Sequence, residues 1–466
     1  MATACGDRVS DTATPGCVRE CTGRSTCATI AGLVLHEVGA QTLPIILAYN
    51  LATIRLGVAF KLPLCFIVGM RFHTTMKNST RYALLFTTLF AACIWLVDAR
   101  GDAHARTQSD YFVYVGTYTR AKSQGIYVYK LAAATGKLTP LGLAAESKDP
   151  SFLALDPTHR YLYAVNEIGD YEGQKSGSVS AFSIDRRTGK LSVLNLIASG
   201  DPGAVHLMVD YTGKYLLVAN YGVGSVVVFP ILADGSLGKA TAHLPHSGHS
   251  IKPRRQLGPH AHSIYVSPDN RFVVSPDLGT DQVYVYRFDA AQGTLAPNDP
   301  PFITVAPGTG PRHLAFDPRG RFAYLVQEFG GIVTVFSYDA AHGGLHQLQT
   351  FPAAPSDFHG PNNCAEVFVH PNGKFLYVSN RGHDSIGVYA IDPVKGTLML
   401  IEHVSTQGKT PRGFAIDPTG SYLIAANQES DTVVAFRIDA KTGRLTPTGQ
   451  KLDVPEPACV VFEPAL

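Results

Sequence analysis

The sequence lacks the short motifs by which many enzymes are recognised. It contains no Gly-x-Ser-x-Gly segment, so a serine mechanism of the α/β-hydrolase type is unsupported. Neither a Walker-type phosphate loop nor a Rossmann glycine fingerprint is present, because Gly308 and Gly310 precede Pro311 and an expected strand rather than a helix. Any site must therefore be found from the fold and not from a single motif.

Charge is scarce and evenly balanced. Asp, Glu, Lys and Arg make up 16% of the 466 residues, the formal net charge is +2, and 45% of the residues are hydrophobic. This composition is too apolar and too balanced for a disordered chain. Because a tight nucleic-acid binder needs concentrated Lys and Arg to neutralise phosphates, we predict no nucleic-acid partner.

Cysteine is scarce outside the N-terminal part of the chain. Six of the eight Cys lie in the first 105 residues, and only Cys364 and Cys459 follow. No Cys-x-x-Cys occurs, and only His36 and His73 lie near the N-terminal cysteines, so the spacing of a zinc site is not met. We predict no disulfide framework in the main part of the chain, and no metal or other cofactor.

Residues 76–105 have the features of an export signal. A basic start precedes an apolar run at 82–97, and residues 103–105 supply the small-x-small pattern of a cleavage site. The alternative is a retained membrane anchor, although the run is short for a span and no basic stop-transfer cluster follows. If the signal is used, the protein is periplasmic or secreted, and the single tryptophan, Trp95, is removed with the signal.

Residues 1–75 precede this signal, whereas a signal peptide normally starts its chain. Our hypothesis is that translation starts at Met76 and that residues 1–75 are an artefactual upstream extension. Residues 106–466 then form the main domain. They contain 30 Lys or Arg and 31 Asp or Glu, which gives a net charge of −1.

A repeat of about fifty residues fills the main domain. Each copy contains an apolar strand, a turn of the Asp-Pro-x-Gly type, an aromatic-rich strand that usually ends in Asn, and a third strand. The turn Asp position recurs every 47 to 57 residues, at Asp156, Asp210, Ser267, Asp317, His370 and Asp417. Short alternating strands at this period predict an all-β fold, a seven-bladed β-propeller with one four-stranded blade per repeat.

The two ends of the domain together supply the remaining blade, which is the first in chain order. Residues 458–464 resemble only the first strand of a repeat, with Glu463 in the Asp position, whereas 111–118 and 125–131 resemble only later strands. Joining them leaves no open sheet edge. We therefore predict that the first blade is closed by the N- and C-terminal strands.

Polar residues recur where the strands of each blade reach one face of the ring. The first strand lines the central channel and the second runs antiparallel to it, so residues just before the first and just after the second emerge together. The Asn that ends most second strands is interpreted as structural. The neighbouring positions vary between blades and include His206, His262, His313, Arg312, Arg381, Arg412, Glu328 and Glu366. Singly, each is typical of a surface or a turn, but together they predict a site for a small anionic ligand.

A long insert, residues 246–262, precedes the first strand of the third repeat. It contains Arg254, Arg255, His260 and His262, and we expect it to lie over the same face as a flap or phosphate-binding loop. A solvated basic loop is the alternative.

Several segments resemble the seven-bladed lactonase family, which includes bacterial 6-phosphogluconolactonase and the fungal carboxymuconate-lactonizing enzymes. The resemblance covers 110–466 and is carried by RRQLGPHAH (254–262), GPRHLAFDPRGRFAYLVQE (310–328), GPNNCAEV (360–367), SNRGHDSI (379–386) and PRGFAIDPTG (411–420). It implies a lactone hydrolase of the 6-phosphogluconolactonase type. The implied catalytic residues are His262, Arg312, Glu328 and Arg381.

The expected substrate is a small anionic lactone or carboxylate. The predicted substrate-binding residues are His206, Arg254, His260, His313, Glu366 and Arg412. Lactone hydrolysis needs a base, for which His262 and Glu328 are both candidates, and cations for the oxyanion and the substrate's anionic group, for which we expect Arg312 and Arg381. No membrane partner is predicted beyond the N-terminal anchor.

Four alternatives stay open at this point. The chain could be a lactonizing cycloisomerase that uses the same groups in reverse, or a non-catalytic binding propeller. A metal could be held if His260, His262, Glu366 and Asp277 met above the channel. Finally, the resemblance favours the cytoplasm rather than export, because sugar-phosphate lactones are cytosolic metabolites.

Overall fold

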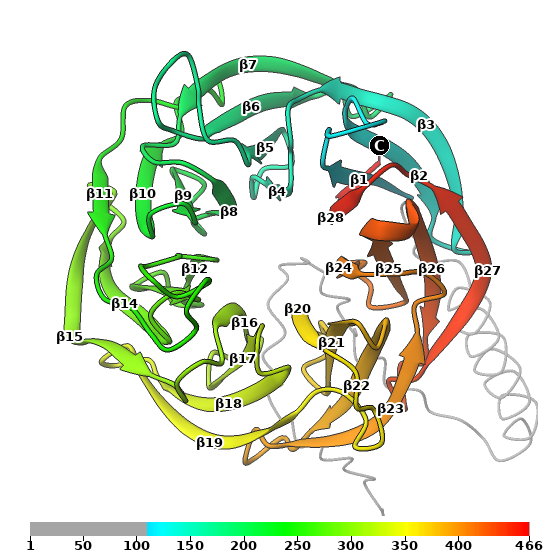
Figure 1. Ribbon diagram of the computed structural model, residues 1–466. Coiled ribbons are helices and arrows are strands. Elements are labelled where there is room, and N and C mark those ends of the chain that lie inside the picture. The colour runs from blue at the N-terminus through cyan, green and yellow to red at the C-terminus, as the bar shows by residue number, and fades with distance from the viewer. Residues whose placement is uncertain (1–109, 466) are drawn as a thin grey trace, which may run out of the picture. The chain divides into compact units, whose positions relative to one another are not determined.

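The computed structural model describes residues 110–465, and these residues form a ring of seven antiparallel sheets (Figure 1). Each sheet has four strands, and the only helix among residues 110–465 is the short 3-10 helix η2 (Gln428–Ser430). The prediction of an all-β, seven-bladed propeller is confirmed. The proposed signal or anchor at 76–105 and the extension at 1–75 lie outside the described residues. No helix within 110–465 is long and apolar enough to span a membrane.

Every blade has the same strand order, from the channel to the rim. The first blade contains β28 (Pro457–Pro464), β1 (Tyr111–Thr117), β2 (Gly125–Ala132) and β3 (Lys137–Glu146). The second blade contains β4 (Phe152–Leu155), β5 (Tyr161–Asn166), β6 (Ser178–Ile184) and β7 (Leu191–Ala198). The third contains β8 (Ala204–Val209), β9 (Tyr215–Asn220), β10 (Ser225–Pro230) and β11 (Ala242–Pro245). The fourth contains β12 (Tyr265–Val266), β13 (Phe272–Asp277), β14 (Gln282–Asp289) and β15 (Thr294–Thr304). The fifth blade contains β16 (Pro311–Phe316), β17 (Phe322–Gln327), β18 (Ile332–Asp339) and β19 (Gly344–Pro352). The sixth contains β20 (Asn363–Val369), β21 (Phe375–Arg381), β22 (Ser385–Ile391) and β23 (Leu398–Ser405). The seventh contains β24 (Pro411–Ile416), β25 (Tyr422–Asn427), β26 (Thr432–Ile438) and β27 (Leu445–Asp453).

The ring is closed by pairing the two ends of the described chain. Strand β28 is the innermost strand of the first blade and pairs antiparallel with β1, in a register that sets Tyr111 opposite Pro464 and Val115 opposite Val460. The predicted closure of the first blade by N- and C-terminal strands is therefore confirmed. Because all seven inner strands surround one axis (Figure 1), their ends can contribute to one site.

The recurring turn Asp holds the inner hairpin in place in four of the seven blades. In the third blade, Asp210 Oδ1 accepts the backbone N–H groups of Lys214 and Tyr215, each at 2.9 Å, and its Oδ2 accepts the N–H of Thr212 at 3.0 Å. Gly213 completes the turn with a φ of 71°, which favours glycine. The same side-chain-to-backbone pattern recurs at Asp156, Asp317 and Asp417.

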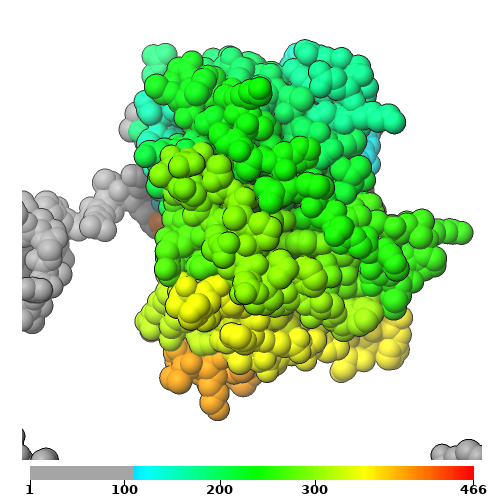
Figure 2. Space-filling model, turned by 90° about the vertical axis from the view of Figure 1, so that its left-hand side faces the viewer, coloured from blue at the N-terminus to red at the C-terminus, as the bar shows by residue number. Residues whose placement is uncertain are grey.

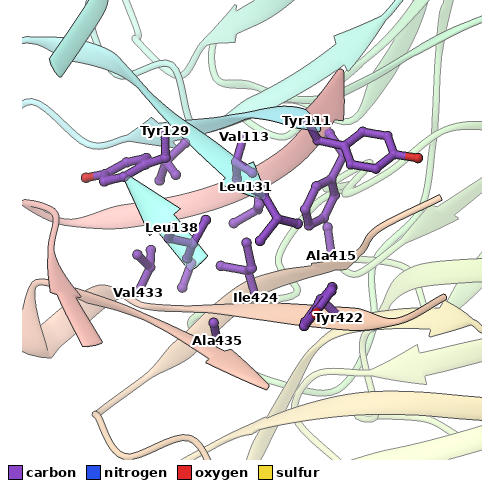
Figure 3. Close-up of a cluster of buried hydrophobic side chains, with 14 of the residues drawn as sticks. Tyr111, Val113, Tyr129, Leu131, Leu138, Ala415, Tyr422, Ile424, Val433 and Ala435 are labelled. Carbon is purple, nitrogen blue, oxygen red and sulfur yellow. The ribbon is translucent and has the colours of Figure 1, made fainter. Parts of the chain in front are cut away.

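The hydrophobic core lies between neighbouring blades. Figure 3 shows one such layer, in which Val113 and Leu131 of the first blade pack against Ile424 and Val433 of the last. All four side chains are fully buried or nearly so. Burying this apolar surface fixes the angle between adjacent sheets, which in turn fixes where the inner strands end.

The Asn that ends four of the second strands has a structural role, as predicted. The amide of Asn220 donates to the carbonyl of Ser199 at 3.1 Å, and that of Asn427 donates to the carbonyl of Thr406 at 3.0 Å. Asn166 and Asn380 donate in the same way to Lys148 and Ala353. These bonds tie the inner hairpin to the segment that enters its own blade.

Candidate active site

Antiparallel pairing brings the central residues of the site together. Within one blade, β16 and β17 pair so that Pro311 faces Gln327, which places the next residues, Arg312 and Glu328, at the same end of the sheet. Arg381 ends β21 of the next blade, and His262 lies just before β12 of the preceding one. Three neighbouring blades therefore supply the four residues that the family resemblance implied to be catalytic.

Glu328 is the centre of this cluster. Its Oε2 accepts a hydrogen bond from Nε of Arg312 at 3.0 Å and forms an ion pair with Nη2 of Arg381 at 2.9 Å. Its Oε1 accepts a hydrogen bond from Nη2 of Arg255 at 3.2 Å. The side chain of Glu328 is 8% exposed, and that of Arg312 is 3% exposed. Three guanidinium groups therefore surround one buried carboxylate.

The charge state of Glu328 follows from two opposing effects. Burial raises its pKa, but the positive charges of Arg381, Arg312 and Arg255 outweigh burial and lower the pKa of Glu328 to about 2. The carboxylate is therefore ionised at neutral pH. Because both of its oxygens are already bound by guanidinium groups, Glu328 is a poor general base.

His262 has the opposite property, because it is buried and neutral. Burial, together with the nearby charge of Arg312, lowers the pKa of His262 well below its usual value. Its Nε2 lies 3.9 Å from Oε2 of Glu328, and its buried Nδ1 has no hydrogen-bond partner among residues 110–465. A neutral imidazole with an unused ring nitrogen is able to accept a proton.

His313 and Glu366 form a second buried pair beneath this cluster. Nδ1 of His313 lies 2.9 Å from Oε1 of Glu366. Burial raises the pKa of Glu366 to about 8, and burial beside Arg312 lowers the pKa of His313 well below its usual value. The pair is therefore neutral at neutral pH, with one proton shared between the carboxyl group and the imidazole.

His206 packs against this pair, although its contacts are mainly aromatic. Its ring lies 4.2 Å from that of Phe152 and 5.2 Å from that of His313, measured between ring centres. Its Nδ1 accepts the backbone N–H of Ile264 at 3.3 Å, and burial lowers its pKa well below the usual value. These contacts fit a wall of the site better than a group that reacts.

The insert loop, residues 246–262, lies against the same cluster. In Figure 2, where residues near 250 are green, atoms of that colour project from the right-hand side of the ring, which is the face turned to the viewer in Figure 1. Nδ1 of His260 lies 2.7 Å from the carbonyl oxygen of Tyr221, so this nitrogen must carry the proton. The ring of His260 also stacks on that of Tyr221, 4.4 Å away. In its neutral form His260 therefore has its lone pair on Nε2.

The loop brings one of its two arginines to the site, and it is Arg255. Besides Glu328, Arg255 donates to the hydroxyl of Tyr221 at 3.1 Å, and its guanidinium lies 4.7 Å from the ring centre of Phe329. Arg254, which we had predicted to bind substrate, is exposed and forms no ion pair with any residue in 110–465. The reason is local: Arg255 is the one that reaches Glu328, and Tyr221 and Phe329 hold it there.

Arg412 belongs to the same site, where it helps to line a cavity. A narrow cavity is lined by His262, Arg312, His313, Glu366 and Arg412, together with Glu167, Ser151, Phe152, Val205 and Ala458. Nη2 of Arg412 lies 4.0 Å from Oε2 of Glu167, which itself accepts a hydrogen bond from the hydroxyl of Tyr118 at 2.6 Å. Four arginine side chains thus gather around the carboxyl groups of Glu328 and Glu167, so basic groups outnumber these two acidic ones.

Asp277 holds the insert loop at both ends. Its Oδ2 lies 2.7 Å from Nδ1 of His246, where the loop begins, and its Oδ1 accepts the backbone N–H of His260 at 2.9 Å. The side chains of Asp277 and His246 are fully buried. Gly279 allows the loop to approach this closely, because a Cβ there would collide with the carbonyl oxygen of Gly258.

Asp277 therefore does not face His262 and Glu366 as a metal ligand would. Within residues 110–465, no three His, Cys, Asp or Glu side chains gather in a way that could hold a metal ion.

Sequence reasoning missed several contributors to the site. Tyr221 and Phe329 contact Arg255, and Tyr118 and Glu167 lie beside Arg412. Tyr118, Glu167 and Tyr221 directly follow the second strands of their blades, the position that the sequence pattern marks as part of this face. Nothing in the sequence distinguishes them from other residues there.

Comparison with known proteins gives a consistent result. The family model described as "Lactonase, 7-bladed beta-propeller" matches residues 112–462. The 6-phosphogluconolactonase of Bacillus subtilis (strain 168) is 37% identical over 76% of this chain and 98% of its own length. The 6-phosphogluconolactonase of Formosa agariphila is 34% identical over 73% of this chain and 96% of its own.

The solved structures agree with these relatives. The structure of a periplasmic gluconolactonase from Pseudomonas aeruginosa superimposes with a TM-score of 0.72 at 38% identity, covering 77% of this chain and all of that one. The family model matches almost the whole of the closed seven-bladed ring, including the clustered His, Arg and Glu side chains described above. The chain belongs to the seven-bladed β-propeller lactonase family.

Proposed function

We propose that the protein is a lactone hydrolase that opens a sugar lactone, or the phosphate ester of one, to the free acid. The observation that carries the proposal is the pairing of a buried neutral histidine, His262, with the arginine-bound carboxylate of Glu328. Relatives named 6-phosphogluconolactonase and a neighbour named gluconolactonase support the same reaction class.

The first half of the reaction needs a base, and we assign it to His262. A water molecule loses a proton to His262 while its oxygen bonds to the lactone carbonyl carbon, and the carbonyl π electrons move onto the oxygen. Glu328 is excluded as this base because three arginines hold it ionised and bind both of its oxygens. Instead, its negative charge, 3.9 Å from Nε2 of His262, stabilises the imidazolium that forms.

The developing oxyanion needs a cation, and Arg312 is placed to supply it. Nε of Arg312 is bound by Glu328 and Nη1 by the carbonyl of Ala365, whereas Nη2 makes no hydrogen bond with any residue in 110–465. Nη2 therefore remains for the substrate oxygen. Such a preorganised charge in a dry site is a large contributor to catalysis.

The second half of the reaction returns the proton. The oxyanion re-forms the carbonyl, the ring C–O bond breaks, and the leaving alkoxide takes the proton from the His262 imidazolium. The net result is addition of one water across the ester bond. We assign the carboxylate product to Arg381, whose side chain is 14% exposed beside Glu328.

A pH-stat assay with purified protein tests the proposal. The substrates are 6-phosphogluconolactone, gluconolactone and muconolactone, with the spontaneous hydrolysis of each subtracted. Turnover of a sugar lactone supports the proposal. Turnover of muconolactone alone would favour a lactonizing enzyme, and a folded protein that turns over none of them would favour a binding propeller.

For location, we propose export. The signal features of residues 76–105 and a structural neighbour named as periplasmic support it. Intact mass of the protein purified from its natural source would give a chain that begins near residue 106 and contains no tryptophan. A native chain that keeps residues 1–70 would overturn both the export proposal and the start at Met76.

A further inference from the structure

Four arginines surround the site, and Arg255 is the most exposed of them. Its side chain is 50% exposed, compared with 3% for Arg312, 14% for Arg381 and 21% for Arg412. The buried Arg312 lies beside the proposed base, so the reacting carbonyl must lie deep. Of these cations, Arg255 is the most open to a substituent that points from this carbonyl toward solvent.

The charge of Arg255 is also in surplus. Glu328 is already bound on Oε2 by both Arg312 and Arg381, at 3.0 and 2.9 Å, so a third guanidinium is not needed to neutralise it. Arg255 takes the second oxygen, Oε1, at the longer distance of 3.2 Å. A partly exposed cation beyond what its carboxylate requires is suited to bind a second anion.

The hydrogen-bonding capacity of Arg255 leads to the same conclusion. Its bonds to Glu328 and to the hydroxyl of Tyr221 both use Nη2. Nε and Nη1 form no hydrogen bond with any residue in 110–465. Nη1 alone carries two N–H groups, so Arg255 keeps charged donors with which to bind an incoming carboxylate or phosphate.

The surroundings of Arg255 hold it in this position. The neighbouring Gln256 is fully buried, donates to the carbonyl of Leu278 at 2.8 Å and accepts the backbone N–H of Lys252 at 3.0 Å. Phe329 lies under the guanidinium, which orients its plane. The same turn leaves Arg254 exposed to solvent. Two adjacent arginines of equal charge thus have different positions relative to the site.

We propose that Arg255 binds the anionic substituent of the lactone, a phosphate or a carboxylate remote from the ring ester, and so selects anionic over neutral substrates. This proposal rests on the proposed lactone hydrolysis. It adds a specificity-determining residue that is distinct from the residues that activate water and hold the oxyanion.

The test compares Arg255→Gln with Arg254→Gln, which removes the same charge one residue away. For 6-phosphogluconolactone, KM should rise about 10- to 100-fold in Arg255→Gln, as expected for losing a charge-assisted hydrogen bond, with kcat little changed. For neutral gluconolactone KM should change less than about threefold in the same variant. Arg254→Gln should keep both values near those of the wild type, and Arg255→Lys should recover only part of the loss.

A binding measurement separates this proposal from the proposed function. Calorimetric titration with 6-phosphogluconate and with gluconate needs no turnover. If Arg255→Gln binds 6-phosphogluconate more weakly than the wild type and Arg254→Gln does not, the role of Arg255 is supported even if no lactone is hydrolysed. Equal losses in the Arg254 and Arg255 variants, or equal losses for 6-phosphogluconate and gluconate in Arg255→Gln, would overturn it.

Discussion

Replacing Glu328 by glutamine tests the electrostatic core of the site most directly. The change keeps the shape of the side chain and removes its charge, which leaves the guanidinium groups of Arg312 and Arg381 without a counter-charge at about 3 Å. Because Arg312 is almost completely buried, water cannot replace the lost carboxylate. We therefore expect Glu328→Gln to lower both the stability of the ring and the rate of lactone hydrolysis.

The size of the stability loss follows from the pKa of Glu328. The fold lowers that pKa from 4.5 to about 2, and each pKa unit corresponds to about 1.4 kcal/mol, so the ionised form is favoured by roughly 3 kcal/mol in the folded state. Since the folded-state pKa is lowered, this contribution is complete above about pH 4.5 and is lost as the pH falls toward about 2. At neutral pH, Glu328→Gln should therefore unfold with roughly 3 kcal/mol less free energy than the wild type.

Urea denaturation at 25 °C, followed by circular dichroism between pH 7 and pH 2.5, measures this difference. The gap between wild type and Glu328→Gln should be largest at neutral pH and shrink steadily below pH 4.5. Glu429→Gln is the control, because Glu429 is exposed and forms no ion pair with any residue in 110–465. A gap of constant size at all pH values, or no gap at pH 7, would refute the electrostatic reasoning.

Three further predictions concern other groups. Arg312→Lys and Arg381→Lys keep the charge but lose the planar guanidinium, so each should lower kcat/KM about 100-fold in the pH-stat assay; full activity in both would remove them from the mechanism. If His262 is the base, kcat/KM should be flat at neutral pH and fall only well below pH 6.5, where the imidazole gains a proton, and His262→Gln should abolish turnover; an acid limb above pH 6.5 would contradict this assignment. Asp277→Asn should release the insert loop, so that trypsin cleaves after Arg254 at least about tenfold faster; an unchanged cleavage rate would show that Asp277 does not hold the loop.

The fold could be predicted because its determinants are local and repeated. Asp210 and its counterparts bind the backbone of their own turn, so the same few residues mark every hairpin in the sequence. The closing strand at 457–464 could be recognised because it matches the first strand of the repeat and lacks the strands that normally follow. Because the first two strands of each blade run antiparallel, the start of the first and the end of the second lie at the same edge of the blade. This is why Arg312 and Glu328 could be placed together from the sequence.

The details of the site could not be predicted in the same way. The insert loop interrupts the repeat, so no register decides which of Arg254 and Arg255 faces inward; that depends on the buried contacts of Gln256 and on the ring of Phe329. Likewise, sequence left His262 and Glu328 equal as bases. The choice between them depends on three arginines that converge on Glu328 from different blades.

The position of β28 constrains the order in which the protein can be made. The innermost strand of the first blade is synthesised after every other strand of the ring, so that blade stays incomplete until residues 457–464 have left the ribosome. Ring closure therefore comes after the synthesis of the other six blades, and until then β1 presents a free edge to neighbouring chains. A circular permutant with its new ends in the connection between β7 and β8 would place every blade in one continuous stretch, and its blades could form in the order of synthesis.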